Sequence, residues 1–210
     1  MEQNTKVKIC GVKDPDIAMA CLEYGADFIG FNFSPFSKRK IEPDNLSEIF
    51  SIFTGLEERS AKLVALFYKN SEEEITSILS EFSFDYVQYV VQESFELPLF
   101  LGSFGIPLLP QFQVKDDFIV EDIELFTNEY MILDSYSKDA GGGTGETFNW
   151  DLLRGIQRKY FLAGGLNPGN VREAIQKVKP FGVDVASGVE SLPGKKDRNL
   201  IKEFIQNAKK

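Results

Sequence analysis

Eight short apolar runs recur along the chain, and most of them lack the alternation of apolar and polar residues that marks a half-exposed strand. Strands buried on both faces, as in parallel sheets covered by helices, show this continuous apolar pattern. The pattern therefore predicts eight buried strands. They are Val7–Cys10, Phe28–Phe33, Leu63–Phe67, Tyr86–Tyr89, Leu108–Phe112, Tyr130–Leu133, Tyr160–Ala163 and Val183–Val185.

Helix signals lie between these runs. Asp14 and Pro15 are typical of an N-cap and a first helical residue, and Gly25 is expected to end that helix. Ser71–Glu74 has the sequence of a capping box. Asn167-Pro168 is expected to start another helix. Each of these starts is followed by apolar residues spaced along one helix face. In the first three helices these residues are Ile17, Cys21 and Leu22; Ile75, Ile78, Leu79 and Phe82; and Val171, Ala174, Ile175 and Val178. The same spacing predicts a last helix, with Leu200, Ile201, Phe204, Ile205 and Ala208 on its apolar face.

The alternation of strands and helices predicts an α/β fold, a single (β/α)₈ TIM barrel with eight parallel strands. At 210 residues the chain is near the lower size limit of that fold, and we expect one domain over residues 1–210. The fifth unit is the weakest, because Pro and Gly interrupt Leu97–Leu109 and leave room for only a short helix. A doubly wound open sheet is the alternative, but no G-x-G-x-x-G follows the first strand.

The composition of the chain excludes several classes of partner and of catalytic site. A hydrophobic content of 43% supports a sizeable core, and a net charge of −9 argues against nucleic acid or an anionic membrane as a partner. MEQNTKVKIC does not resemble a signal peptide, and no apolar stretch is long enough to span a membrane, so we expect a cytoplasmic protein. Two cysteines indicate neither a disulfide framework nor a metal site, and the absence of His excludes Ser-His and Cys-His couples.

In a barrel of this kind the functional residues lie at the C-terminal ends of the strands. Cys10 ends the first expected strand and is a candidate nucleophile or base, provided that nearby positive charge lowers its pKa. Lys8, Lys13 and Arg39 are the nearby cations. The alternative for a free cysteine is a small buried apolar residue, which suits Cys21.

Asp134 ends the sixth strand and is a candidate proton donor, although aspartate at such a position is often only a turn residue. The loop after the second strand, Ser34–Lys40, carries three adjacent cations, and Arg39 is suited to bind a carboxylate with two hydrogen bonds. The alternative is a solvent-exposed basic loop that binds no ligand.

Glycine-bearing loops follow the sixth, seventh and eighth strands. Small residues let backbone N–H groups approach an anion, and barrels often bind phosphate after strands seven and eight. A single glycine run is equally consistent with a flexible connector, but three consecutive strand ends favour a phosphate site. The candidate binding residues are Gly142, Gly143, Gly164, Gly165, Asp184, Ser187 and Gly188.

Several segments together resemble one family. They are KICG (Lys8–Gly11), GADFIGFNFSPFSKRKIEP (Gly25–Pro43), LDS and GGTGETFNW within Leu133–Trp150, AGGLNPGNV (Ala163–Val171) and VDVASGVESLPGKKD (Val183–Asp197). In this order, from Lys8 to the last helix, they resemble phosphoribosylanthranilate isomerase, a (β/α)₈ barrel enzyme of tryptophan biosynthesis.

The resemblance implies a role for each candidate. Cys10 would be the general base, Asp134 the general acid and Arg39 the ligand of the anthranilate carboxylate, while the glycine loops would bind the phosphate. The reaction is an Amadori rearrangement, in which an acid opens the ribose ring to an iminium and a base removes the C2 proton. Because the iminium is the electron sink, we expect neither a metal nor an organic cofactor. The expected partner is a phosphorylated small molecule, and the protein is expected to be a monomer or a homodimer.

The chain departs from the family pattern at several positions. Val87–Val91 replaces the usual VQLHG, so its His is missing; Glu146 replaces a common Lys, Asn149 a common Asp and Ala186 a common Ser. The acid–base pair is retained. For it to work near neutral pH, we expect a lowered thiol pKa at Cys10 and a raised carboxyl pKa at Asp134.

Two other functions compete with the isomerase. The missing His is compatible with a non-catalytic barrel that binds a phosphorylated ligand, although such a protein needs neither Cys10 nor Asp134. A barrel enzyme with another phosphorylated substrate, such as an indole-glycerol-phosphate enzyme or a sugar-phosphate isomerase, needs a catalytic Lys or paired Glu at strand ends. The sequence places neither in that way.

Overall fold

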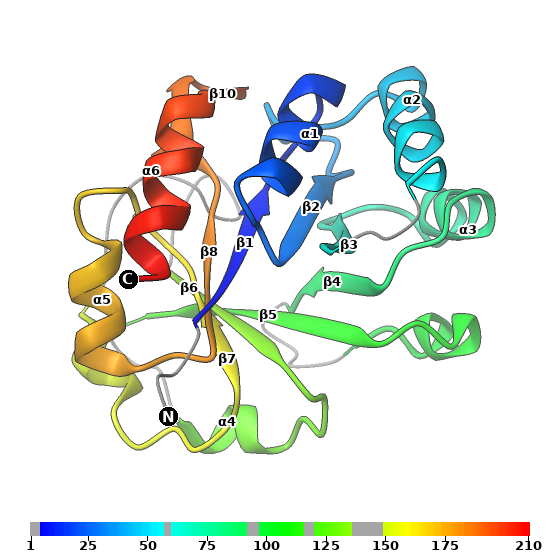
Figure 1. Cartoon of the computed structure of the whole chain (residues 1–210). Coiled ribbons are helices and arrows are strands. Elements are labelled where there is room, and N and C mark those ends of the chain that lie inside the picture. The colour runs from blue at the N-terminus through cyan, green and yellow to red at the C-terminus, as the bar shows by residue number, and fades with distance from the viewer. Residues whose placement is uncertain (1–4, 57–59, 92–96, 116–119, 136–148) are drawn as a thin grey trace.

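The apolar runs form the strands of a closed barrel, in which each strand pairs with its neighbour in the chain and the first pairs with the last (Figure 1). All eight pairings are parallel, which confirms the predicted (β/α)₈ architecture. The computed structural model describes residues 5–56, 60–91, 97–115, 120–135 and 149–210.

The barrel strands are β1 (Lys6–Cys10), β2 (Phe28–Asn32), β3 (Lys62–Phe67), β4 (Tyr86–Val90), β5 (Leu108–Val114), β6 (Met131–Ser135), β7 (Tyr160–Leu162) and β8 (Gly182–Val185). The α-helices are α1 (Pro15–Glu23), α2 (Pro43–Thr54), α3 (Glu72–Glu81), α4 (Val120–Glu124), α5 (Val171–Val178) and α6 (Arg198–Ala208). Three 3₁₀ helices, η1 (Leu99–Phe104), η2 (Trp150–Leu153) and η3 (Ser187–Val189), and a hairpin, β9 (Glu190–Leu192) with β10 (Lys195–Lys196), complete the described elements.

Local signals determine several element ends. Ser71 accepts a hydrogen bond from the Glu74 N–H while the Glu74 carboxylate accepts one from the Ser71 N–H, so the predicted capping box is present at α3. Gly25 has φ of 86° and ends α1 as predicted, because glycine reaches the left-handed region without steric cost. The short helix expected in the fifth unit is η1, a 3₁₀ helix.

The helix expected to start at Asn167-Pro168 starts later, at Val171. The Asn167 side chain accepts a hydrogen bond from the Gly169 N–H, and the Asn170 side chain accepts one from the Asn167 N–H. Together with the bonds from the Asn170 and Val171 N–H groups to the Asn167 carbonyl, they hold residues 168–170 as a turn that leads into the helix. The predicted start was therefore wrong by about one helical turn.

Two apolar layers stabilise the barrel. Outward-facing strand residues pack against the surrounding helices, whereas a second cluster fills the barrel interior with Phe28, Val64, Leu109, Ile132, Phe161 and Ala163. Side chains alternate along a strand, so residues two positions further along these strands also point into the barrel, nearer its C-terminal end. Several of these positions are polar and buried: Lys8, Gln88, Gln111, Asp134 and Asp184.

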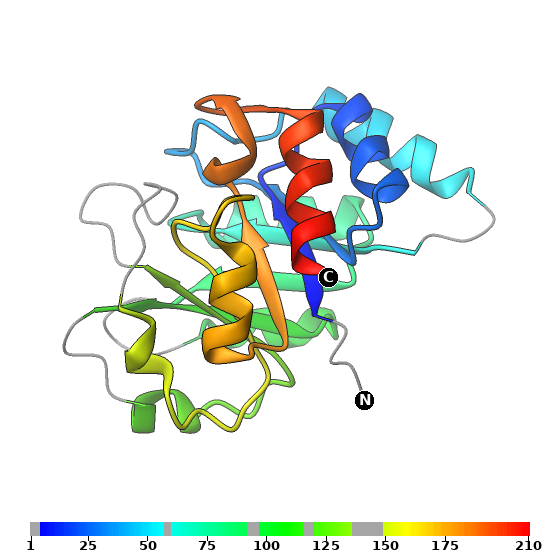
Figure 2. The ribbon, with the colours of Figure 1, turned by 60° about the vertical axis from the view of Figure 1, so that its left-hand side comes forward.

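The last helix completes the ring around the barrel. α6 contacts both α5 and α1, so it lies between helices from the two ends of the chain (Figures 1 and 2). The β8–α6 connection, which contains η3 and the β9–β10 hairpin, lies beside the loop after β2, where Glu190 contacts Arg39 and Gly194 approaches the Lys38 carbonyl.

Candidate active site

The candidate residues gather at one end of the barrel, because parallel strands all end at the same side. Cys10 is the last residue of β1, and Asp134 is the next-to-last residue of β6. Arg39 lies in the loop after β2, Gly164 and Gly165 follow β7, and η3 brings Ser187 and Gly188 to the end of β8.

A buried ion pair lies inside the barrel beside Cys10. Lys8 Nζ donates a hydrogen bond of 2.9 Å to Asp184 Oδ1, and the Lys8 side chain is fully buried. Burial alone would lower the pKa of the Lys8 ammonium, but the charge of the Asp184 carboxylate and the ionised form of Cys10 outweigh it and raise that pKa. A Cβ added at Gly30 on β2 would lie 3.1 Å from Cys10 Sγ and 3.2 Å from Lys8 Nζ. Glycine at this position therefore leaves space for the thiol and the ammonium to share.

The pKa of the Cys10 thiol is raised, so the expectation of a lowered pKa was wrong. Complete burial disfavours the thiolate more than the Lys8 and Lys196 ammonium groups favour it, and the Asp184 carboxylate adds to the rise. Lys8, one of the expected cations, is present, yet burial of the Cys10 sulfur inside the closed barrel has the larger effect on the thiol pKa.

The pKa of Asp134 is raised to about 7, as the sequence predicted. Burial disfavours the carboxylate, and the nearby Asp184 charge adds to the effect, while Ser135 and Lys8 oppose it. The protonated form of the carboxyl group is therefore populated alongside the ionised form near neutral pH. Its Oδ2 accepts a 2.8 Å hydrogen bond from Gln111, and no described side chain from another strand hydrogen-bonds to Oδ1.

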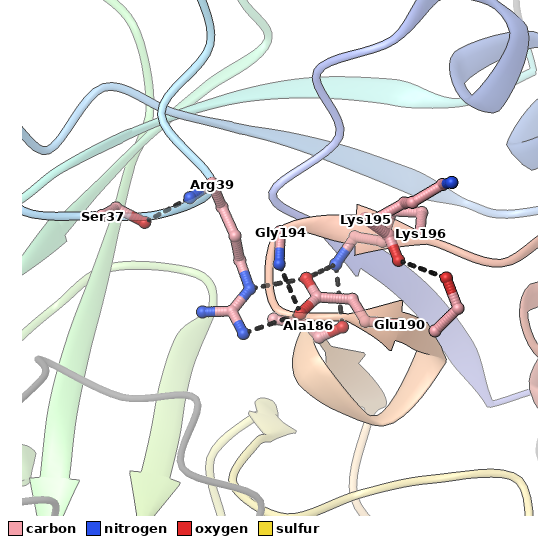
Figure 3. Close-up of polar contacts among 8 residues, drawn as sticks. Ser37, Arg39, Ala186, Glu190, Gly194, Lys195 and Lys196 are labelled. Carbon is pink, nitrogen blue, oxygen red and sulfur yellow. Dashed lines mark hydrogen bonds and ion pairs between the residues drawn. The ribbon is translucent and has the colours of Figure 1, made fainter.

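Arg39 is held in place by Glu190, the first residue of β9 (Figure 3). Arg39 Nε and Nη2 donate hydrogen bonds of 2.7 and 2.9 Å to the two carboxylate oxygens of Glu190. Lys196 Nζ donates to Glu190 Oε1 at 3.0 Å and to the Ala186 carbonyl at 2.8 Å. Two cations thus surround one carboxylate, which leaves a net charge of +1 in a strongly acidic chain.

Gly11 lets the Arg39 side chain pack against the backbone after β1. Gly11 has φ of 73°, and an added Cβ would lie 2.7 Å from Arg39 Cδ. Lys38 and Lys40, the neighbours of Arg39 in the basic loop, are exposed. Of the three cations, Arg39 is therefore the one directed toward the centre of the site.

The glycine loops after β7 and β8 pack closely on the barrel and on each other. A Cβ at Gly164 would collide with Ser135 at the end of β6, and a Cβ at Gly188 would collide with the Leu166 carbonyl. Gly165 has φ of 65°, and its carbonyl accepts a hydrogen bond of 2.9 Å from Asn170. Close packing thus accounts for glycine at positions 164 and 188.

The remaining candidates are placed differently. Gly142 and Gly143 lie outside the described residues. Asp184 lies within the barrel, where it is the partner of Lys8. Val90 on β4 takes the place of the missing His and is buried, and Asn149 caps η2 by accepting a hydrogen bond from the Asp151 N–H.

Sequence reasoning assigned no role to four residues of this site. Glu190 and Lys196 lie in a quoted motif, and Gln88 and Gln111 interrupt apolar strand runs. A polar residue within a buried run is a usable signal, because a buried polar side chain needs a partner. The partners come from distant parts of the chain, so the signal does not identify them.

Among the described residues, no cluster of three or more His, Cys, Asp and Glu side chains suits a metal ion. No described helix has both the length and the apolar character needed to cross a membrane.

Comparison with known proteins gives a consistent result. The model of a family described as N-(5′-phosphoribosyl)anthranilate (PRA) isomerase matches residues 7–207. The N-(5′-phosphoribosyl)anthranilate isomerase of Leptospira interrogans is 50% identical over 99% of this chain and 96% of its own length. That of Aquifex aeolicus is 40% identical over 97% of this chain and 98% of its own length.

Solved structures agree with the sequence relatives. The phosphoribosyl anthranilate isomerase of Thermotoga maritima is 36% identical and superposes with a TM-score of 0.80, covering 98% of each chain. A phosphoribosyl anthranilate isomerase in complex with reduced 1-(o-carboxyphenylamino)-1-deoxyribulose 5-phosphate is 35% identical and superposes with a TM-score of 0.76, again over 98% of each chain.

Proposed function

Since the chain belongs to the N-(5′-phosphoribosyl)anthranilate isomerase family, we propose that Cys10 and Asp134 catalyse its reaction as general base and general acid. The enzyme converts N-(5′-phosphoribosyl)anthranilate to 1-(2-carboxyphenylamino)-1-deoxyribulose 5-phosphate in tryptophan biosynthesis. One observation carries the assignment of the acid: the buried Asp134 carboxyl, at the end of β6, has a pKa of about 7 and holds a proton near neutrality.

The first step is the opening of the ribose ring. Asp134 donates its proton to the ring oxygen, the bond from that oxygen to C1 breaks, and the nitrogen lone pair forms the iminium. A carboxyl with its usual pKa would be ionised at neutral pH and could not donate, so burial of Asp134 serves the reaction directly.

The second step is removal of the C2 proton by the Cys10 thiolate, which yields an enolamine that tautomerises to the ketone. Burial opposes formation of this thiolate. Two positive charges favour it when the reaction needs it: the Lys8 ammonium, and the iminium cation that ring opening creates. The base therefore becomes effective after the acid has acted.

Arg39 and the glycine-bearing loops bind the two anionic groups of the substrate. Glu190 occupies Nε and Nη2 of Arg39, which leaves the other edge of the guanidinium for the anthranilate carboxylate. For the phosphate we propose the backbone N–H groups of the loops at Gly164, Gly165, Ser187 and Gly188, together with the loop that contains Gly142 and Gly143.

The two alternatives are less well supported. A ligand-binding barrel without activity would not need a raised carboxyl pKa beside a barrel thiol, and the curated relatives are named as isomerases. A lysine-dependent barrel enzyme needs a neutral amine, whereas the raised pKa of Lys8 keeps it as an ammonium paired with Asp184.

We also propose that the protein acts in the cytoplasm, as a monomer or a homodimer, on a small phosphorylated substrate and without nucleic acid. The acidic net charge of −9 supports the last point. A relative from Thermotoga maritima is described as dimeric.

Growth without tryptophan of a bacterial strain that lacks this isomerase is the direct test. Expression of the chain is expected to restore growth, and Asp134→Asn is expected to abolish the rescue at equal protein level. Failure of the unaltered, folded protein to restore growth and to turn over N-(5′-phosphoribosyl)anthranilate in vitro would contradict the function.

A further inference from the structure

A chain of hydrogen-bonded side chains crosses three neighbouring strands inside the barrel and ends at Asp134. Gln88 Nε2 on β4 donates a hydrogen bond of 2.6 Å to Gln111 Oε1 on β5. Gln111 Nε2 in turn donates one of 2.8 Å to Asp134 Oδ2 on β6. All three residues are buried, with exposed fractions of 1%, 3% and 8%.

The direction of these bonds is set by the carboxyl group. The ionised carboxylate only accepts hydrogen bonds, so Gln111 turns its NH₂ group to Asp134 and its carbonyl oxygen to Gln88. The protonated carboxyl keeps this arrangement when its proton is on Oδ1, because Oδ2 then still accepts from the same NH₂ group. Gln88 then presents its own NH₂ group and locks the Gln111 amide in that orientation. Within the described part of the chain, Asp134 Oδ1 is buried and no side chain from another strand hydrogen-bonds to it, although the backbone and hydroxyl of the adjacent Ser135 also act on the carboxyl group.

We propose that Gln111, held by Gln88, is a positioning residue that fixes the Asp134 carboxyl group and reserves Oδ1 as the oxygen that carries and delivers the proton. The inference rests on the proposed role of Asp134 as general acid. Oδ2 accepts from Gln111 and so behaves as the carbonyl oxygen of the acid. The proton then resides on Oδ1, the oxygen that the network leaves free for the substrate.

Other groups also act on the Asp134 carboxyl. Asp184 on β8 raises its pKa, and Lys8 on β1 and the adjacent Ser135 lower it. Gln111 adds a hydrogen bond from β5, and a donor to a carboxylate favours the charged form. Removal of that donor is therefore expected to raise the pKa of Asp134, while a purely packing role would leave it unchanged.

Gln111→Leu tests the proposal, with Gln206→Leu on the exposed face of α6 as the matched control. We expect kcat to fall about tenfold, the rate equivalent of one buried hydrogen bond. The lower break in the pH profile of kcat/KM is expected to move to higher pH, and a ¹³C NMR titration of the Asp134 carboxyl is expected to move with it. The control should leave all three unchanged.

An unchanged carboxyl titration in folded Gln111→Leu, or an unchanged kcat, would overturn the proposal. If Gln111→Leu does not fold, Gln88→Leu is the second variant, because it frees the Gln111 amide to rotate but keeps the Gln111 side chain. The titration of the Asp134 carboxyl in that variant then tests the proposal in the same way. Asp134→Asn, assayed in parallel, separates the two hypotheses. An active Asp134→Asn enzyme refutes the assignment of the acid, whereas an inactive one together with an unaffected Gln111→Leu refutes only the role of Gln111.

Discussion

Arg39 and Glu190 are joined side by side by two hydrogen bonds, although 151 residues separate them in the chain. Burial raises the pKa of Glu190, but the hydrogen bonds from Arg39 and the charge of Lys196 outweigh it and hold that pKa below its ordinary value. Glu190 is therefore ionised at neutral pH. It holds the guanidinium in one plane before any substrate carboxylate arrives.

Glu190→Gln should weaken substrate binding. The amide places an NH₂ group against the donors of Arg39, Lys196 or the Gly194 N–H, so the paired geometry is lost. We expect KM to rise about tenfold and kcat to change less, because carboxylate binding is largely uniform binding. Steady-state kinetics measure both, and Glu203→Gln on the exposed face of α6 is the control. An unchanged KM would show that Glu190 does not align Arg39 for the substrate.

Cys10→Ser should abolish most of the activity, since a serine hydroxyl is not ionised at neutral pH and cannot act as the base. Loss of a general base costs about 10²–10⁴ in rate, and we expect kcat to fall within or beyond the upper part of that range. Cys21, the other cysteine, is buried on α1, and Cys21→Ser makes the same chemical change at a residue with no proposed catalytic role. Retention by Cys10→Ser of more than roughly a tenth of wild-type kcat lies outside that range and refutes the thiol as base.

The pH profile of kcat/KM should be bell-shaped with a wide plateau. The active form needs a protonated Asp134 and a deprotonated Cys10, but Asp134 loses its proton first, with a pKa of about 7, while the pKa of Cys10 is raised. The lower break therefore belongs to Asp134 and the upper one to Cys10, the reverse of what a lowered thiol pKa would give. An initial-rate series across pH locates both breaks, and a profile without a break near pH 7 contradicts the assignment.

Asp134→Asn should stabilise the folded protein at high pH. The folded-state pKa of about 7 lies above the ordinary value of 3.8, so the folded state binds more protons between these pH values. The free energy of unfolding of the wild type thus falls as pH rises from about 4 to 7, by up to roughly 4 kcal/mol from this group. Urea unfolding at pH 4 and pH 8 measures the difference, with exposed Asp16→Asn as control. If the free energy of unfolding of Asp134→Asn depended on pH as strongly as that of Asp16→Asn, Asp134 could not be buried and protonated.

Gly165→Val should raise KM through the phosphate. The positive φ of Gly165 disfavours a β-branched residue, and the bulk of valine blocks close approach to the backbone amides. Loss of a hydrogen bond to a charged group costs about 1–3 kcal/mol, or roughly 5- to 150-fold in KM. Gly102→Val on η1, where an added Cβ meets nothing within 4 Å, is the control. A normal KM in Gly165→Val would place the phosphate elsewhere.

The order of the elements could be read from the sequence, because strands buried on both faces are apolar throughout and helix starts depend on local hydrogen bonds. The eight strands and the Ser71 capping box follow from such local patterns. The same logic placed Cys10 and Asp134 at one end of the barrel, since parallel strands share an end. The helix after β7 was misplaced because two Asn side chains hold a turn, and competition between side-chain and backbone hydrogen bonds depends on geometry.

By itself, then, the sequence determined the barrel and which residues stand at the strand ends. Only the tertiary structure decided their partners and their ionisation. Lys8 and Asp184 are 176 residues apart, and the closure of β1 against β8 brings them together. The Cys10 pKa rises rather than falls because burial, which depends on all eight strands, outweighs the charge of a neighbour along the same strand. Long-range packing determines both the distances between charges and their loss of solvent, and no local pattern encodes either quantity.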